Sequence, residues 1–183
     1  MLFYIHGFGS SGFSKKATQL KAHFGEKAVF APSLSHIPDL AIHTLEQMIE
    51  QLKPYHDITL LGSSLGGYYA TYLSDKYALK TVLVNPSVYP YKTLAKNIGL
   101  NYSYHDKSDY AFIQAHIDSL KAYEVENIDM KKFLLLVQTG DEVLDYQEAK
   151  RKYSDSQMIV QEGGNHSFEG FETIFGRIER FSL

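Results

Sequence analysis

The sequence predicts an α/β fold, in which a central sheet of parallel strands carries helices on both faces. Three observations predict it. Short apolar runs recur along the chain, segments with helical spacing lie between them, and glycine-rich turns follow several of the runs. Most of the runs are continuous rather than alternating, which is typical of strands buried on both faces of a parallel sheet. Strand–helix alternation of this kind implies right-handed crossovers.

The expected elements alternate from the N-terminus onward. Strands are expected at Leu2–His6, Ala28–Ala31, Ile58–Leu61, Thr81–Val84, Phe133–Gln138 and Gln157–Gln161. Helices are expected at Lys15–Phe24, Ile37–Leu52, Leu65–Tyr77, Tyr146–Lys152 and Phe168–Phe181. The pattern therefore predicts a sheet of about six mostly parallel strands.

A segment of about forty residues, 87–130, interrupts this alternation. It is rich in Tyr and His and contains "NYSYHDKSDY". A connection of this length is usually functional or carries helices of its own, which we expect at Leu94–Ile98 and Tyr110–Tyr123. We expect residues 87–130 to form a small cap over the C-terminal edge of the sheet, within a single domain at 1–183. The alternative is a surface insertion without a role.

Composition and charge exclude several classes of protein. The chain is 44% hydrophobic and 21% charged, with a formal net charge of -3 and no basic stripe, so no nucleic-acid partner is expected. It contains no cysteine, which excludes disulfides, thiolate metal sites and cysteine nucleophiles. An apolar strand beginning at residue 2 leaves no room for a signal peptide, and no apolar run is long enough to span a bilayer. We expect a cytoplasmic protein without stable membrane insertion; the sequence carries no signal for an oligomeric state.

The motif Gly62-Ser63-Ser64-Leu65-Gly66 lies between the third expected strand and a helix. It matches G-x-S-x-G, in which the central serine sits in a strained conformation at the tip of a sharp turn. A side chain at either flanking glycine would clash with the neighbouring strand or helix. Ser64 is therefore the predicted nucleophile. Ser63 is the rival hydroxyl, but no glycine lies two residues before it.

A serine nucleophile needs a base, and the base needs an acid that orients it. On this type of sheet the chain order is Ser, then Asp or Glu, then His. Three histidines follow Ser64, and two of them, His105 and His116, fall in the cap. His166 lies in "EGGNHSF", the glycine-rich loop between the last strand and the final helix. His166 is therefore the predicted base.

The acid is expected after the preceding strand, in "QTGDEVLDY". Asp141 stands where the chain leaves that strand, and from there its carboxylate would reach the ring of His166. Asp145 is the alternative acid, although its position also suits the N-cap of the next helix. Glu142 is expected to point away.

The segment "YIHGFGSSGF" contains G-x-G-x-x-G, a spacing typical of dinucleotide-binding turns. Such a site also needs an Asp or Glu at the end of the second strand, but that strand ends "VFAPSLS". Beside Ser64, the same loop would supply backbone N–H groups to an oxyanion instead. We therefore expect the amides of Phe8 and Leu65 to form an oxyanion hole, and His6 to hold the loop.

Five blocks run in order along nearly the full length: "YIHGFGSSGFSKKA", "LLGSSLGGYYATYLS", "VLVNPSVYP", "QTGDEVLDY" and "EGGNHSFEGFE". Together they resemble the YqiA-type esterases, a small bacterial branch of the α/β-hydrolases, and residues 91–130 match least. The resemblance implies a reduced α/β-hydrolase fold without the superfamily's first two strands. It also implies Ser64, Asp141 and His166 as a catalytic triad. The segment "HGFGSSG" stands where the family more often has Asn-Ser-Ser-Pro, a change expected to loosen the loop without removing the Phe8 amide.

These observations predict a serine esterase that acts on a small-molecule acyl ester, or an acyl thioester, through an acyl-enzyme intermediate. The chemistry needs no metal and no organic cofactor. Asn85-Pro86, after the fourth strand, is expected at the rim of the site, either shaping the pocket or only forming a turn. Two other classes stay open: a non-catalytic receptor with the same fold, and a nucleotide-dependent oxidoreductase. A thioesterase or a peptidase would share the same triad.

Overall fold

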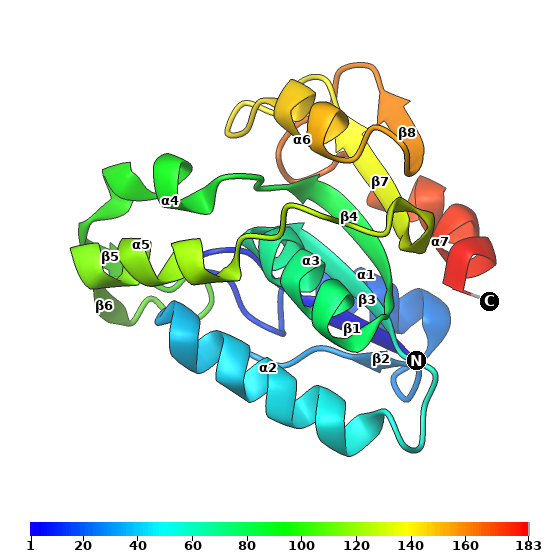
Figure 1. The fold of residues 1–183 in the computed structure, drawn as a ribbon, viewed down its shortest axis with the longest axis horizontal. Helices are drawn as coiled ribbons and strands as arrows, with labels where there is room; N and C mark the ends of the chain where they lie inside the picture. The colour runs from blue at the N-terminus through cyan, green and yellow to red at the C-terminus, as the bar shows by residue number, and fades with distance from the viewer. Residues whose placement is uncertain (183) are drawn as a thin grey trace.

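A six-stranded, fully parallel sheet forms the centre of the computed structural model, which describes residues 1–182 (Figure 1). The strand order is β2-β1-β3-β4-β7-β8. The strands are β1 (Leu2–Ile5), β2 (Val29–Phe30), β3 (Thr59–Ser64), β4 (Lys80–Pro86), β7 (Phe133–Gln138) and β8 (Gln157–Gln161). All six expected strands are therefore confirmed.

The strand order reverses direction at the boundary between β1 and β3. From β1 the chain passes to β2 at one edge, and from β3 it proceeds through β4 toward the other edge. The loops that follow β1 and β3 therefore diverge to opposite faces of the sheet. In open parallel sheets such a reversal leaves a crevice at the carboxyl ends of the two strands, where ligands bind. The predicted nucleophile lies at this crevice, at the end of β3.

Helices cover both faces of the sheet, as predicted. A separate hydrophobic cluster lies on each face of the sheet. Helices α2, α3 and α6 contribute to the cluster on one face, and α1 and α7 contribute to the cluster on the opposite face. Consecutive strand residues alternate between the clusters, which is why the apolar runs are continuous. The helices are α1 (Lys15–Phe24), α2 (Pro38–Leu52), α3 (Leu65–Tyr77), α6 (Tyr146–Lys152) and α7 (Phe175–Ser182).

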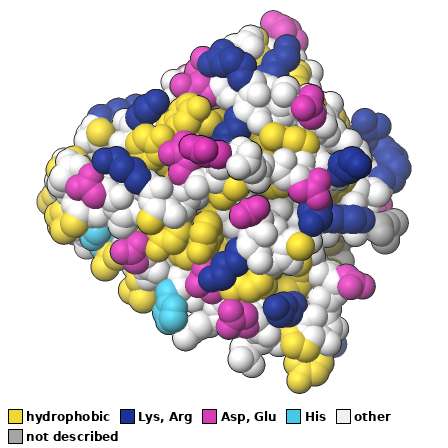
Figure 2. All heavy atoms as spheres, in the orientation of Figure 1, with side chains coloured by type: hydrophobic (Ala, Val, Ile, Leu, Met, Phe, Trp, Pro, Cys, Tyr) yellow, Lys and Arg dark blue, Asp and Glu magenta, His cyan; other side chains and the backbone are white. Residues whose placement is uncertain are grey.

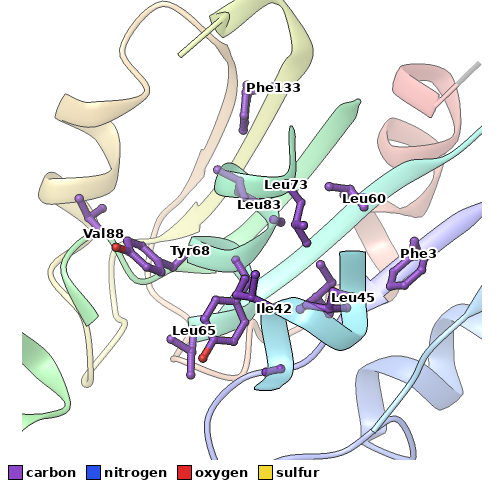
Figure 3. Close-up of a cluster of buried hydrophobic side chains, with 14 of the residues drawn as sticks. Phe3, Ile42, Leu45, Leu60, Leu65, Tyr68, Leu73, Leu83, Val88 and Phe133 are labelled. Atoms are coloured by element: carbon purple, nitrogen blue, oxygen red, sulfur yellow. The ribbon is translucent and has the colours of Figure 1, made fainter. Parts of the chain in front are cut away.

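Helix α3 is largely buried and packs on the sheet beside α2. Figure 3 shows Phe3, Leu60 and Leu83 from the strands packed with Leu45 of α2 and Leu73 of α3. All five side chains are fully excluded from solvent. This packing fixes the position of α3, and therefore of the turn from which it begins.

The final helix is shorter than expected. A helix was predicted over Phe168–Phe181, but α7 begins at Phe175 and is preceded by a 3-10 turn, η4 (Phe171–Ile174). The reason is local: Phe168 has φ 60° and Gly170 has φ 66°, and a right-handed helix cannot include such residues.

The cap contains an antiparallel hairpin that the sequence did not predict. The expected helix over Tyr110–Tyr123 is wrong in its first part, because Asp109–Phe112 is a strand that pairs with Gly99–Tyr102. The expected helix at Leu94–Ile98 is only a 3-10 turn at Ala95–Asn97, and a short helix at Pro90–Thr93 precedes it. The cap elements are α4 (Pro90–Thr93), η1 (Ala95–Asn97), β5 (Gly99–Tyr102), β6 (Asp109–Phe112), α5 (Gln114–Leu120), η2 (Lys121–Tyr123) and η3 (Met130–Lys132).

The cap hairpin lies over the loop that follows β1, on the left in Figure 1. The amide of Tyr104 donates to the carbonyl of Gly9 at 2.8 Å. The ring of Phe8 packs edge-on against Tyr110 and Phe112, with centroids 5.9 and 4.9 Å away. The cap hairpin therefore packs directly against the loop that follows β1.

The visible surface is electrostatically mixed. On the face drawn in Figure 2, Lys and Arg side chains are interspersed with Asp and Glu rather than gathered into a basic stripe. Within residues 1–182, the helices are all too short or too polar to cross a membrane.

Candidate active site

Ser64 forms a sharp elbow between β3 and α3. It is the last residue of the strand and adopts φ 56° and ψ -123°, a conformation that non-glycine residues rarely occupy. Glycine is required on both sides: a Cβ at Gly62 would lie 2.3 Å from the carbonyl oxygen of Gly66, and one at Gly66 would lie 2.1 Å from that of Ile5. The Ser87 amide donates to the Ser64 carbonyl at 3.0 Å. The elbow predicted from G-x-S-x-G is therefore present.

The structure brings Ser64, His166 and Asp141 into one hydrogen-bonded chain. His166 Nε2 is 3.1 Å from Ser64 Oγ, and His166 Nδ1 is 2.8 Å from Asp141 Oδ2. Because a carboxylate only accepts, Nδ1 carries the proton, which leaves Nε2 free to accept from the serine hydroxyl. The Asp141 side chain is 2% exposed and that of His166 is 22% exposed. The histidine therefore faces solvent-accessible space while its carboxylate partner does not.

The tight turn after β7 fixes the Asp141 carboxylate. Its Oδ1 accepts from the amides of Val143 and Leu144, both at 2.9 Å. Asp145, the alternative acid, instead caps α6 by accepting from the Gln147 amide at 2.9 Å. Of the two candidate acids, only Asp141 contacts the ring of His166.

Glu142 does not point away, contrary to expectation. Its Oε2 accepts from the backbone amide of His166 at 2.9 Å, and this hydrogen bond lowers the pKa of the Glu142 carboxyl. The carboxylate therefore helps to hold the loop that carries His166. Because Glu142 and His166 are far apart in sequence, the contact depends on the fold rather than on a local pattern.

Gln138, at the end of β7, is a supporting residue that the sequence analysis missed. Its side chain is buried, and Oε1 accepts from the amides of Asn165 and Glu169 at 3.0 and 2.8 Å. Its Nε2 donates to the Glu169 carbonyl at 2.7 Å and to Gln161 Oε1 at 2.8 Å. A Cβ at Gly164 would collide with this amide. The one signal in the sequence is a polar residue that ends the apolar run "FLLLVQ".

Asn85 makes a second buried clamp on the same loop. It was expected at the rim of the site, but it is 2% exposed. Its Nδ2 donates to the carbonyls of Asn165 and His166 at 3.0 and 3.2 Å, and its Oδ1 accepts from the Gln138 amide at 3.0 Å. Asn85 therefore neither lines the pocket nor serves only as a turn residue, because it links β4 and β7 to the histidine loop.

The loop after β1 packs directly on the elbow. A Cβ at Gly7 would lie 3.0 Å from the Cβ of Ser64, so only glycine fits here without displacement. Within residues 1–182 the Phe8 amide donates to no protein acceptor. The Leu65 amide is at the first position of α3, where no intrahelical acceptor exists. Both residues line the cavity that contains Ser64.

His6 holds the loop that follows β1, as expected. Its Nε2 accepts from the Leu34 amide at 3.0 Å, and Nδ1 therefore donates to the Gly7 carbonyl at 2.8 Å. Burial lowers the pKa of His6, although the hydrogen bond to Gly7 opposes the shift. The neutral ring matches these two contacts, one accepting and one donating.

The elbow opens into a cavity of about 820 Å³. Ser64 and His166 are part of its lining. Helix α1 and the segment that leads to α7 contribute Ser14, Lys15, Lys16, Gln19, Phe171 and Glu172. The cap and the loop after β7 contribute Thr93, Leu94, Lys96, Asn97, Val143 and Leu144.

Solved structures with the same fold include several hydrolases. Est1E from Butyrivibrio proteoclasticus, described with ferulic acid bound, has a TM-score of 0.75 at 15% identity over 98% of this chain and 86% of its own. Paleococcus ferrophilus monoacylglycerol lipase has a TM-score of 0.71 at 17% identity over 99% and 93%. Mouse alpha/beta hydrolase domain-containing protein 10 has a TM-score of 0.69 at 16% identity over 98% and 89%. At these identities the likeness shows the fold alone, which is the α/β-hydrolase fold.

Sequence relatives cover the full length of the chain. A UPF0227 protein of Shewanella sp. strain MR-7 is 26% identical over 190 residues, which span 100% of this chain and 99% of the relative. The UPF0227 protein YcfP of Salmonella gallinarum is 25% identical over 186 residues, 99% and 98% of the two chains. The model of the uncharacterised protein family UPF0227 matches residues 1–183. The resemblance to YqiA-type proteins is thereby confirmed: the chain belongs to family UPF0227, the YcfP/YqiA family.

Proposed function

We propose that this protein is a serine esterase that hydrolyses small-molecule acyl esters, with acyl thioesters as a second substrate class. One observation carries the proposal: Ser64 Oγ, the imidazole of His166 and the carboxylate of Asp141 are joined by hydrogen bonds of 3.1 and 2.8 Å at the bottom of an open cavity. A hydroxyl aligned with a base and an orienting acid is the arrangement that activates a serine nucleophile.

In the first half-reaction, Ser64 Oγ attacks the ester carbonyl carbon while its proton passes to Nε2 of His166. The carbonyl oxygen becomes an oxyanion, which the Phe8 and Leu65 amides stabilise. The tetrahedral intermediate collapses by breaking the bond to the alcohol oxygen, and His166 returns the proton to the departing alcohol. Asp141 keeps the imidazole in the required tautomer and stabilises its charged form.

In the second half-reaction, water replaces the alcohol. His166 Nε2 takes a proton from the water as its oxygen attacks the acyl carbon, and a second tetrahedral intermediate forms over the same two amides. Its collapse breaks the bond to Ser64 Oγ, which recovers the proton from His166. The carboxylic acid leaves and the serine is restored.

The helix that follows the elbow supports this chemistry. Ser64 lies at the N-terminal end of α3, where the unpaired amides and the helix dipole favour negative charge. The solved structures that share the fold include a monoacylglycerol lipase and Est1E with ferulic acid, a carboxylic acid, bound. This common theme favours ester hydrolysis over peptide hydrolysis.

The proposal is tested by labelling with a fluorophosphonate, a reagent that phosphonylates activated serines, followed by peptide mapping. Wild-type protein is expected to carry one adduct on Ser64. The Ser64→Ala variant is expected to carry none, whereas Ser63→Ala, the matched change at the neighbouring buried hydroxyl, keeps the adduct. His166→Ala is expected to lose it, because the serine then lacks its base. Absence of labelling in folded wild-type protein would contradict the proposal and favour the receptor hypothesis.

A further inference from the structure

Lys16 is a partly buried lysine that the esterase mechanism does not use. It lies in the first turn of α1 and lines the same cavity as Ser64. Its ammonium is 5.9 Å from the centre of the Phe171 ring, close enough for a cation–π interaction. Lys15, its neighbour in the same turn, is exposed.

The ammonium of Lys16 has no anionic partner among the described residues. Across residues 1–182, no carboxylate lies within 4.0 Å of its Nζ, and it makes no side-chain hydrogen bond. Burial lowers the pKa of Lys16 to about 8, and the negative charge of Asp141 opposes this shift. The Asp141 oxygens, however, already accept from His166 and from two backbone amides. Lys16 therefore keeps three donors and a charge with no protein acceptor to satisfy them.

The other acidic residues in this part of the cavity leave the ammonium without a partner. Glu172 is exposed and accepts from Gln19 Nε2 at 3.2 Å, and Glu169 is exposed with its backbone held by Gln138. A partly desolvated cation gains from an anionic acceptor that enters with a ligand, because such hydrogen bonds are charge-assisted. The part of the cavity lined by α1 thus suits an anion.

The lining of the cavity is chemically mixed. It includes the aliphatic side chains of Leu94, Val143 and Leu144 as well as three lysines, Lys15, Lys16 and Lys96, of which only Lys16 is partly buried rather than exposed. An ester bound with its carbonyl at Ser64 extends both of its substituents into this cavity. An apolar substituent suits the aliphatic side chains, and a charged substituent suits the partly buried ammonium of Lys16.

From this arrangement we infer that the substrate of the proposed esterase carries an anionic group, a carboxylate or a phosphate, which the ammonium of Lys16 binds. Lys16 is then a specificity-determining residue, and esters of dicarboxylic acids or of anionic alcohols are the preferred class. The inference rests on the proposed function, because it names the substrate of the same site.

The test compares kcat/KM for anionic esters with that for neutral esters of matched size. p-Nitrophenyl hydrogen glutarate against p-nitrophenyl pentanoate places the carboxylate on the acyl side. The pair of p-(butyryloxy)benzoate and its methyl ester places the carboxylate on the alcohol side. The pair of p-(butyryloxy)phenyl phosphate and phenyl butyrate places a phosphate there instead. The three pairs distinguish the sources of the anion.

Wild-type protein is expected to favour the anionic member of at least one pair by about tenfold, the effect of a charge-assisted hydrogen bond. Lys16→Met, which keeps the apolar stem, is expected to abolish this preference while neutral esters are hydrolysed as before. Lys16→Arg keeps the charge and is expected to retain it. Lys27→Met, a change at an exposed lysine that does not line the cavity, is expected to leave the preference unchanged.

Two outcomes would overturn the inference. One is wild-type protein that hydrolyses neutral esters and shows no preference in any pair. The other is a Lys16→Met variant that loses activity equally on both members of a pair, which would assign Lys16 to the support of Asp141 or of the fold. Failure of the proposed function is recognised separately, because wild-type protein would then hydrolyse no ester of either kind and take no label on Ser64.

Discussion

Replacing Gln138 by Met tests whether the buried amide clamp positions the base. Methionine is unbranched and of similar length, so it fills the same space but makes none of the hydrogen bonds. The change removes four of them: two accepted from the amides of Asn165 and Glu169, and two donated to the Glu169 carbonyl and to Gln161 Oε1. The apolar strand before position 138 is untouched.

The size of the effect follows from the groups left without partners. Each buried donor or acceptor that loses its partner costs about 1–3 kcal/mol, but Glu169 is exposed, so water satisfies part of what is lost. We expect the free energy of unfolding to fall by about 2–5 kcal/mol. His166 directly follows Asn165, and a displacement of about 1 Å at a reacting group lowers the rate by about 100-fold. The rate of serine labelling is expected to fall accordingly.

Urea denaturation followed by circular dichroism measures the stability, and the rate of fluorophosphonate labelling below the unfolding transition measures the alignment of the base. Gln157→Met is the matched control, because Gln157 is an exposed glutamine on β8; it should change stability by no more than about 0.5 kcal/mol. A Gln138→Met variant that unfolds and labels like the wild type would refute the reasoning.

Three further predictions concern the elbow, the acid and the cation. Gly66→Ala places a methyl 2.1 Å from a β1 carbonyl oxygen, so we expect thermal denaturation to show a loss of about 3 kcal/mol or more; wild-type stability would contradict this. Asp141→Asn is expected to lower kcat for ester hydrolysis by about 10,000-fold, whereas Asp145→Asn, which only weakens a helix cap, leaves it nearly intact; equal losses would refute the assignment. Lys16, whose charged neighbours are Asp141 and Lys15, is protonated below its pKa of about 8. The preference for anionic esters should therefore fade as pH rises through that value. A ratio of kcat/KM for anionic and neutral esters that stays constant with pH would argue against this role of Lys16.

The sheet was predictable because its physical cause is local. Strands buried on both faces are apolar along most of their length, and "LFYI" and the first five residues of "FLLLVQ" show this directly. The elbow was predictable because its glycines appear in the sequence itself. A Cβ at Gly62 or Gly66 would overlap backbone atoms, so no other residue fits at these two positions without displacement. Chain order left His105, His116 and His166 as candidate bases, and the loop after the last strand favoured His166. The position at which the chain leaves β7 favoured Asp141.

The cap hairpin was not predictable in the same way. Its strands are four residues long and largely exposed, so neither the alternation nor the continuity of apolar residues marks them. The residues that fix the histidine loop were missed for another reason. Gln138, Asn85 and Glu142 act through hydrogen bonds to residues between 23 and 81 positions away, which no local pattern encodes. A buried polar side chain at a strand end is the only local trace of such a role.

The loop that would form the oxyanion hole shows why the cap matters to the site. Gly9 has φ 67°, in the left-handed region that glycine adopts most readily, so glycine suits this turn. Nor is the loop left free. The Tyr104 amide binds the Gly9 carbonyl, and a Cβ at Gly9 would lie 3.2 Å from the Tyr104 ring and 3.3 Å from the Tyr110 hydroxyl. The cap hairpin therefore compensates for the flexibility that the glycine adds. The segment whose secondary structure was hardest to predict from the sequence is thus the one that holds the loop carrying the Phe8 amide.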